Sequence, residues 1–331
     1  MRLLQRCTAR MRRLRPVLGE HLYAAVAVAV TSSLAGLLAA RLFSSRDAVV
    51  SFIALSACGA VLYVGYWVRP RARLLRAVRI GLRRGEFHVV YQPIVDMHTR
   101  HCVGVEALLR WVHPTFGAAG PGQFIGELQG TRLLGELTRF VLREANHALI
   151  QPPFPQHWHI SVNVCARHLM EDGFAEDVCE SAGMVKKRLV LELTERSCVE
   201  RTPRVDLVLS HMRQRGVRLS LDDFGTGFSN FDLLADFRFD YVKVDRIFLA
   251  MRGEASIEFL KSVAALVHTY GARVVAEGVE TAVEHDVVLR SGIDLAQGYL
   301  YGKPMAVDQL RAFASASIKT LQDDTGTGLK A

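Results

Sequence analysis

Polar side chains, most of them carboxylates or amides, recur at the ends of successive predicted strands. In chain order they are Glu106, Asn163, Glu192, Glu195, Asp222, Asp223, Lys243, Asp245, Glu277, Glu280 and Gln297. One acidic residue after a strand is usually a helix N-cap or a solvated charge, but polar groups at seven consecutive strand ends need another explanation. Carboxylates that converge on one cavity repel one another unless cations neutralise them. Because the candidate ligands are oxygens with no cysteine among them, the pattern favours Mg²⁺ or Mn²⁺.

Eight short β-branched runs carry these residues. They lie near 87–94, 102–109, 157–164, 188–193, 217–222, 240–245, 272–277 and 293–298. Helical stretches separate most of them, for example 131–150, 203–215, 256–270 and 280–291. This alternation predicts an α/β protein with a (β/α)8 TIM-type barrel, in which the active site gathers at the C-terminal ends of the strands. A doubly wound open sheet is the alternative, because periodicity does not show whether a sheet closes.

The connection between the first two runs is too short for a helix. Residues 96–102 join them, whereas a parallel crossover needs a dozen residues or more. We therefore expect an antiparallel first strand, with a turn centred near His98 and Thr99. In that register Gln92 lies across from Val105, next to Glu106, and both strands reach the same barrel mouth.

Two long apolar stretches precede the barrel. Residues 21–40 and 48–68 contain no Lys, Arg, Asp or Glu, and each is long enough to cross a hydrocarbon core about 30 Å thick as a helix. They predict a transmembrane helical hairpin with the lipid bilayer as a partner. Because most nearby arginines lie outside the pair, the positive-inside rule predicts a multi-pass protein of the bacterial inner membrane, with both termini and the barrel in the cytoplasm. A cleaved signal peptide followed by one span is the alternative.

The charge of the chain is unevenly distributed. The first 84 residues hold 15 arginines against only Glu20 and Asp47, so the net charge of +8 describes an arginine-rich N-terminal part joined to a mildly acidic domain. This distribution argues against a DNA or RNA polymer as the partner.

Three shorter segments complete the predicted organisation. Residues 1–20 form an arginine-rich N-terminus, residues 69–85 a basic linker helix, and residues 314–331 a disordered tail. The six cysteines show neither a CxxC pair nor zinc-ligand spacing, which indicates buried thiols in a reducing compartment.

Eight ordered motifs resemble the signature of EAL-domain cyclic di-GMP phosphodiesterases. They are Tyr91-Gln92-Pro93-Ile94, Glu106-Ala107-Leu108-Leu109-Arg110-Trp111, Ser161-Val162-Asn163, Glu192-Leu193-Thr194-Glu195, Asp222-Asp223-Phe224-Gly225-Thr226-Gly227, Lys243-Val244-Asp245, Ala276-Glu277-Gly278-Val279-Glu280 and Gln297-Gly298-Tyr299-Leu300-Tyr301-Gly302-Lys303-Pro304. The match covers about residues 75–313, and it predicts a catalytic barrel over 86–313. The resemblance implies a modified barrel whose first strand is antiparallel, in agreement with the predicted hairpin.

The resemblance also implies roles for individual residues. The implied metal ligands are Glu106, Asn163, Glu192, Asp222, Asp223 and Asp245, with Asp222 bridging two ions and Asp245 either a ligand or a support for one. The implied catalytic residues are Lys243 and Glu277, which border the attacking water, and Glu195, which braces the loop over 223–230. The implied substrate contacts are Gln92, Arg110, Glu280 and Gln297. Whether Lys243 or Glu277 activates the water stays open at this point.

The implied reaction is metal-dependent hydrolysis of cyclic di-GMP to linear 5′-pGpG. Two divalent cations a few ångströms apart lower the pKa of a bridging water and neutralise the phosphoryl oxygens. A catalytically silent cyclic di-GMP receptor and a signalling scaffold are the alternatives, and a homodimer is a family expectation. The chain departs from the family pattern at Gln129, at Arg196 and over residues 228–231, which puts the catalytic rate in doubt rather than the chemistry.

Overall fold

Eight strands of one sheet close into a barrel in the computed structural model, which describes residue 59 and residues 71–114, 117–194, 201–225, 230–249 and 254–326. The barrel strands are β1 (Phe87–Asp96), β2 (Cys102–His113), β4 (His159–Val164), β5 (Leu189–Thr194), β6 (Arg218–Phe224), β7 (Tyr241–Val244), β8 (Arg273–Ala276) and β9 (Leu295–Gln297). Their order is β1-β9-β8-β7-β6-β5-β4-β2, and β1 also pairs with β2, which closes the ring. A short strand β3 (Gly117–Ala119) adds to β2. The predicted TIM-type barrel is confirmed, and the open sheet is excluded.

The first strand runs against its neighbours. β1 pairs antiparallel with both β2 and β9, whereas the other barrel strands pair in parallel. The Asp96 carboxylate tightens the β1–β2 turn by accepting hydrogen bonds from the backbone N–H groups of His98 and Thr99, both at 3.0 Å. The prediction of an antiparallel first strand is therefore confirmed.

The register of this hairpin differs by one residue from the prediction. Val95 pairs with Cys102, as a turn at His98 and Thr99 requires, but the register shifts between Ile94 and Val95. Beyond this bulge Gln92 pairs directly with Glu106 rather than with Val105. A bulge inserts one extra residue into one strand, and turn length alone does not predict it.

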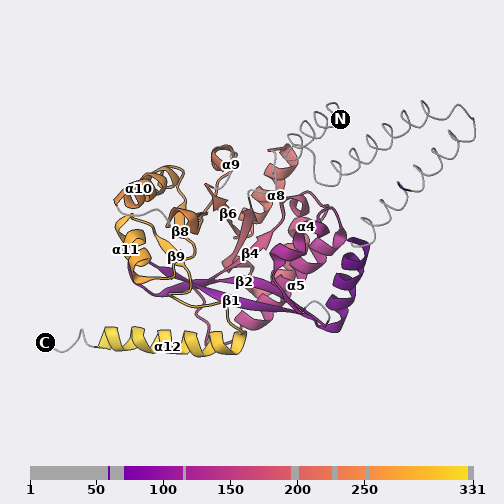
Figure 1. Cartoon of the computed structure of the whole chain (residues 1–331), viewed down its shortest axis with the longest axis horizontal. Helices are drawn as coiled ribbons and strands as arrows, with labels where there is room; N and C mark the ends of the chain where they lie inside the picture. Colours follow the sequence, from indigo (N-terminus) through magenta and orange to yellow (C-terminus); the bar gives the residue numbers. More distant parts are fainter. Residues whose placement is uncertain are drawn as a thin grey trace, which may run out of the picture. The chain divides into compact units, whose positions relative to one another are not determined.

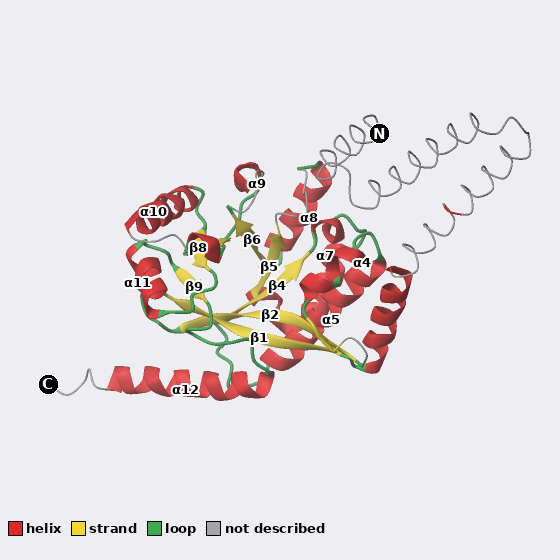
Figure 2. Cartoon of the chain, in the orientation of Figure 1, coloured by secondary structure: helices red, strands yellow, loops and turns green. Residues whose placement is uncertain are grey.

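Helices surround the ring of strands (Figures 1 and 2). They are α4 (Ile125–Leu128), α5 (Arg132–Leu149), α6 (Ala166–Leu169), α7 (Phe174–Ala182), α8 (Pro203–Gln214), α9 (Asn230–Asp236), α10 (Glu254–Thr269), α11 (Ala282–Arg290) and α12 (Val307–Gly326). Short 3₁₀ turns lie at Pro121–Gln123, Gly183–Arg188 and Arg246–Phe248. Local signals set several ends: Thr281 and Glu284 form a capping box at the start of α11, and Thr202 accepts a hydrogen bond from Val205 N at the start of α8. The predicted helices over 131–150, 203–215, 256–270 and 280–291 correspond to α5, α8, α10 and α11.

Apolar side chains fill the end of the barrel that is opposite the strands' C-terminal ends. One buried cluster consists of Ile94, Val190, Tyr241, Val275 and Leu295. Full burial of an aliphatic side chain of this size contributes about 1.5–3 kcal/mol. Because this end is packed, solvent and ligands reach the polar residues further along the same strands only from the other end of the barrel, its C-terminal mouth.

The membrane prediction is not supported by the described residues. None of their helices combines the length and the apolar composition that a bilayer crossing requires. The long helices α5 and α12 carry charged side chains, which hydrocarbon does not solvate. This finding contradicts the predicted multi-pass location in the inner membrane. The segments 21–40 and 48–68 on which that prediction rests lie outside the described residues, apart from Gly59.

The two ends of the domain carry helices. Residues 71–84 are helical, within the segment predicted as a basic linker helix. At the other end α12 runs to Gly326, past residue 314, where a disordered tail was predicted to begin. Leu310 and Ala314 are fully buried one turn apart, and this apolar contact together with an alanine-rich sequence favours continued helix.

Candidate active site

Polar side chains from separate strands meet in the barrel mouth. Buried members are Glu106 of β2, Glu192 of β5, Asp222 of β6 and Lys243 of β7. Asn163 of β4 and Glu277, which follows β8, complete the group at its more open side. In a parallel barrel all strand C-termini reach the same rim, so residues far apart in sequence become neighbours here. We call these six residues, together with Asp223, the mouth cluster.

Lys243 lies at the centre of the mouth cluster. Its Nζ is 2.6 Å from Glu277 Oε1, 2.9 Å from Glu192 Oε2, 3.4 Å from Glu106 Oε2 and 3.5 Å from Asp222 Oδ1. One ammonium among four carboxylates leaves an excess of negative charge in a buried place. That excess must be relieved by protons or by further cations.

The pKa values of the cluster reflect this imbalance. Burial opposes the charge of Lys243, but Asp222, Glu106 and Glu192 outweigh burial and raise the pKa of Lys243 well above its ordinary value. Burial and the neighbouring Glu106 raise the pKa of Glu192 well above its ordinary value. Burial raises the pKa of Glu277 to about 7, against the opposing effect of Lys243. These shifts favour the charged form of Lys243 and the protonated forms of Glu192 and Glu277, and both effects reduce the excess of negative charge.

Glu106 behaves differently because it accepts hydrogen bonds. Burial works against its ionisation, yet Lys243 and the amides of Gln297 and Asn163 together lower the pKa of Glu106. Asn163 Nδ2 donates to Glu106 Oε1 at 2.7 Å, and Gln297 Nε2 donates to Glu106 Oε2 at 2.7 Å. One carboxylate oxygen of Glu106 is thus held by an amide from β4 and the other by an amide from β9. Both hydrogen bonds favour the ionised form of Glu106.

Asp222 and Asp223 both face the mouth although they are adjacent on β6. Successive side chains of a regular strand point to opposite faces. Here the register to β7 shifts between Leu221 and Phe224, and Asp223 has a φ of 58°. This left-handed conformation is uncommon for a residue other than glycine. It breaks the alternation and turns the second carboxylate toward the first.

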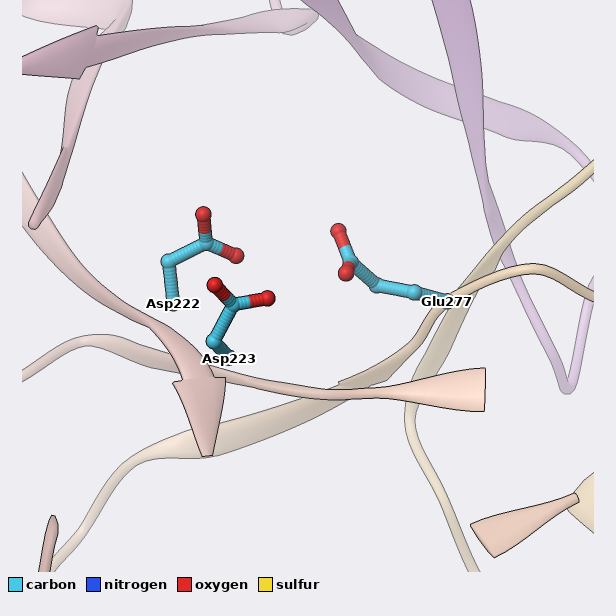
Figure 3. A group of neighbouring side chains, drawn as sticks. All are labelled: Asp222, Asp223 and Glu277. Carbon is cyan, nitrogen blue, oxygen red and sulfur yellow. The ribbon is translucent and has the colours of Figure 1, made fainter. Parts of the chain in front are cut away.

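The two aspartates and Glu277 form a compact trio of oxygen donors. One carboxylate oxygen of each lies within 4.8 Å of the others. Figure 3 shows the Asp222 and Asp223 carboxylates side by side, with Glu277, which follows β8, facing them. In the described structure Asp222 Oδ1 is buried and accepts no hydrogen bond, although Lys243 Nζ lies 3.5 Å away. A buried carboxylate oxygen without a hydrogen bond is a suitable ligand for a further cation.

The predicted substrate contacts Gln92 and Gln297 lie inside the barrel. Both are buried, and Gln297 Nε2 donates to Gln92 Oε1 at 3.0 Å as well as to Glu106. Gln92 Nε2 in turn donates to the carbonyl oxygen of Gly302 at 3.2 Å. The two amides therefore link β1, β9 and the segment after β9 to Glu106. The sequence did not reveal this link, because it depends on the one-residue register shift between β1 and β2.

The remaining predicted residues are spread around the rim. Arg110 is half-buried on the same face of β2 as Glu106, and its Nη1 donates to the carbonyl oxygen of Leu109. Glu280 is paired with Arg246 at 3.4 Å. Asp245 caps the 3₁₀ turn after β7 by accepting a hydrogen bond from Ile247 N at 2.8 Å. Glu195 lies outside the described residues.

Comparison with protein families identifies the barrel. The model of the EAL domain matches residues 72–304. Among curated proteins, cyclic di-GMP phosphodiesterase PdeL of Escherichia coli is 33% identical over 236 residues, which cover 69% of this chain and 65% of PdeL. Cyclic di-GMP phosphodiesterase NbdA of Pseudomonas aeruginosa is 33% identical over 246 residues, which cover 72% of this chain and 31% of NbdA. The chain thus spans less than two thirds of either relative.

Solved structures show the same fold. The PaMucR phosphodiesterase in complex with c-di-GMP is 32% identical, with a TM-score of 0.65, and the match covers 72% of this chain and 99% of that chain. The calcium and c-di-GMP complex of Klebsiella pneumoniae BlrP1 is 26% identical, with a TM-score of 0.56, and the match covers 66% of this chain and 56% of that chain.

Proposed function

The chain belongs to the EAL-domain family, and from that premise we propose that it hydrolyses cyclic di-GMP to linear 5′-pGpG with the help of divalent cations. The observation that carries this proposal is the mouth cluster, in which four carboxylates surround Lys243 within 3.5 Å. A cyclic dinucleotide brings two phosphodiesters, and a site rich in carboxylates accepts phosphate oxygens only when cations lie between them.

Glu106, Asn163, Glu192 and Asp222 would hold one divalent cation, and Asp222 with Asp223 a second. The buried Asp222 Oδ1, which accepts no hydrogen bond in the described structure, and the oxygen donors of Asp222, Asp223 and Glu277 support this assignment. Mg²⁺ and Mn²⁺ suit such donors. Bound cations would lower the pKa of water and neutralise the phosphoryl and leaving oxygens.

We assign Glu277 as the general base that accepts a proton from the attacking water. Its side chain keeps 22% of its surface exposed, against 12% for Asp222, 7% for Glu106 and 1% for Glu192, so it is the most open to water of the four carboxylates around Lys243. Lys243 is held protonated by the surrounding carboxylates and would stabilise negative charge near Glu277, 2.6 Å away. Water adds its oxygen to phosphorus, the bond from phosphorus to the 3′ oxygen breaks, and that oxygen leaves with a proton. The product carries one 5′-phosphate and one 3′-hydroxyl.

Product analysis tests the proposal. The purified full chain, incubated with cyclic di-GMP and either Mg²⁺ or Mn²⁺, should yield 5′-pGpG and no product after EDTA treatment. The Glu106→Gln variant keeps the size of the side chain but removes a negative oxygen, so turnover should fall by at least about 100-fold. The matched control is Glu258→Gln, because Glu258 is exposed and pairs only with Lys261 in the described structure. Its turnover should equal that of the unchanged chain.

Two outcomes would contradict the proposal. Tight binding of cyclic di-GMP without any product, with either cation, would favour a silent receptor. Equal turnover by the Glu106→Gln variant and the unchanged chain would remove Glu106 from the catalytic site.

A further inference from the structure

The 3₁₀ turn Arg246–Phe248 lies directly after β7, between the two strands that carry the carboxylate trio. β7 pairs on one side with β6, which holds two of the three carboxylates, and on the other side with β8, which Glu277 follows. The Asp245 carboxylate caps the turn by accepting a hydrogen bond from Ile247 N. A capped turn at this place can contact the loops on both sides of β7.

Phe248 packs against Gly225, two residues after Asp223. Gly225 has a φ of 94°, a conformation that residues other than glycine rarely adopt. A Cβ atom at Gly225 would lie 2.5 Å from Cζ and 2.7 Å from Cε2 of Phe248, closer than two carbon atoms approach without repulsion. The missing side chain therefore lets the Phe248 ring rest against the backbone that carries Asp223.

Helix α10 holds Phe248 in this position. The Phe248 ring stacks on the ring of Phe259, with centroids 5.0 Å apart and planes 22° apart. The buried hydroxyl of Ser256 donates to the carbonyl oxygen of Phe248 at 3.0 Å. Both the ring and the backbone of Phe248 are thus restrained, so the ring limits how far the loop at Gly225 can move.

The same turn contacts the loop after β8 through Arg246. Gly278 follows Glu277 and has a φ of 68°. A Cβ atom at Gly278 would lie 2.6 Å from Cβ and 2.9 Å from Cδ of Arg246, so the aliphatic part of Arg246 packs against this backbone. Arg246 Nη1 also pairs with Glu280 at 3.4 Å. One turn therefore supports the backbone beside two of the three carboxylates.

Such support matters because the carboxylates of Asp223 and Glu277 repel each other before a cation binds. A cation is bound tightly only when its ligand oxygens are already held near the coordination distance. We propose that the turn Arg246–Phe248 positions Asp223 and Glu277 for a divalent cation, and that Phe248 is a positioning residue of this site. The inference rests on the proposed function, which supplies the cation.

Calorimetric titration of the purified full chain with Mn²⁺, in the absence of substrate, tests the proposal. Phe248→Leu keeps an apolar side chain but removes the part of the ring that contacts Gly225. The Kd of one bound Mn²⁺ should rise about 10–100-fold, as it does when other groups that orient metal ligands are removed. In turnover assays the Mn²⁺ concentration for half-maximal rate should rise by the same factor. At saturating Mn²⁺, kcat and KM should change less than about threefold.

The matched control is Phe154→Leu, which makes the same substitution at the opposite end of the barrel. Phe154 is buried near Trp158 in the segment before β4. Both variants lose the same atoms from a packed place, so both should lose stability. The Mn²⁺ affinity should fall in Phe248→Leu alone, because a purely structural contact does not change how the folded protein binds the ion.

Gly225→Ala approaches the same contact from the loop. Its control is Gly271→Ala, because Gly271 has a φ of 76° but no atom lies within 4 Å of the new Cβ. Gly225→Ala should weaken Mn²⁺ binding, whereas Gly271→Ala should not. In a variant with both Gly225→Ala and Phe248→Leu the two losses of affinity should not add, since each removes the same contact.

Unchanged Mn²⁺ affinity in Phe248→Leu, or losses that add fully in the double variant, would overturn the inference and leave the proposed function intact. If Phe248→Leu failed to fold, Gly225→Ala would decide, and normal Mn²⁺ affinity in that variant would overturn the inference. Absence of Mn²⁺ binding by the unchanged chain would instead remove the cations from the proposed function itself.

Discussion

Lys243 is a buried cation whose removal should affect both stability and catalysis. In a Lys243→Met variant four carboxylates lose their shared counter-charge, and the loss of one partner from a buried ion pair typically costs about 3–5 kcal/mol. We therefore expect the free energy of unfolding, measured by urea titration in EDTA, to fall by about that amount. Divalent cations should restore part of it, because they bind the carboxylates only in the folded protein. Turnover should fall at least about 100-fold.

Lys261→Met is the control for this prediction. Lys261 pairs with Glu258 at 2.8 Å on the surface of α10, and exposed pairs contribute less than about 1 kcal/mol. If the Lys243 and Lys261 variants lost equal stability in EDTA, Lys243 would not be the counter-charge of the mouth cluster.

Residue types predicted the composition of the mouth cluster but not its geometry. Glu106, Glu192 and Asp222 converge because parallel strands end at one rim, which is a property of the fold. The inward turn of Asp223 depends on its φ of 58° and on the irregular register beside it. A single sequence gives no sign of that strain, because aspartate is common in ordinary turns. The hydrogen bonds from Gln297 to Gln92 and Glu106 were missed for a similar reason.

The four helices predicted by range, α5, α8, α10 and α11, begin and end within two residues of the predicted bounds. Helix α8 begins after Thr202 and at Pro203, and α11 begins with a capping box at Thr281. Both signals act within one turn of the chain, so they can be recognised without knowledge of the fold. The hairpin register cannot be predicted from such local signals. The register shift between Ile94 and Val95 arises where β1 pairs with both β2 and β9. Glu195 and the proposed roles of the site residues stay predictions.

The junction of β1, β2 and β9 predicts a positioning role for Gln92. Gln92 is buried, and among the described hydrogen bonds its side chain is linked to that of Glu106 through Gln297, so a Gln92→Leu variant should misplace a cation ligand without removing a substrate contact. We expect kcat to fall about tenfold while KM changes less than about threefold. Steady-state kinetics with cyclic di-GMP measures both values. A rise in KM with unchanged kcat would instead indicate the direct guanine contact that the family resemblance implies.

The close approach of β9 to the loop after β8 makes Gly298 essential for packing. A Cβ atom at Gly298 would overlap the carbonyl oxygen of Val279, which is backbone and cannot turn away. We expect Gly298→Ala to lower the free energy of unfolding by more than about 2 kcal/mol, as overpacking does in other cores. The control is Gly120→Ala, where no atom lies within 4 Å of the new Cβ. A stability loss by Gly298→Ala no larger than that of the control would show that the two segments can separate.

At the scale of the whole molecule, the barrel is polar at one end and apolar at the other. Ile94, Val190 and Leu295 close the apolar end, and this asymmetry directs ligands to a single mouth. The strand count and the polar strand ends were enough to predict that arrangement. The apolar runs at 21–40 and 48–68 predicted a membrane location, which the helices of the described residues contradict; apart from Gly59, the two runs lie outside those residues.

His159, near the apolar end of the barrel, predicts how stability depends on pH. Its ring is buried and stacks on Tyr241 with ring centroids 5.3 Å apart. Burial, with Arg218 and Arg273 nearby, lowers the pKa of His159 to about 3, whereas an unfolded histidine has a pKa of about 6.5. Between these values the unfolded chain binds a proton that the folded chain does not. The stability that the neutral ring contributes is therefore fully present above pH 6.5 and is lost as the pH falls toward 3.

Urea unfolding at pH 7.5, 6.0 and 5.0 should measure this effect. Below pH 6.5 each such histidine lowers the free energy of unfolding by up to about 1.4 kcal/mol per pH unit. His159→Phe keeps the stacked ring but cannot be protonated, so its stability should decline less steeply than that of the unchanged chain, by about that amount per unit. His268→Phe is the matched control, because His268 is exposed and pairs with Asp294. Equal slopes for His159→Phe and the unchanged chain would mean that His159 is already accessible to protons in the folded barrel.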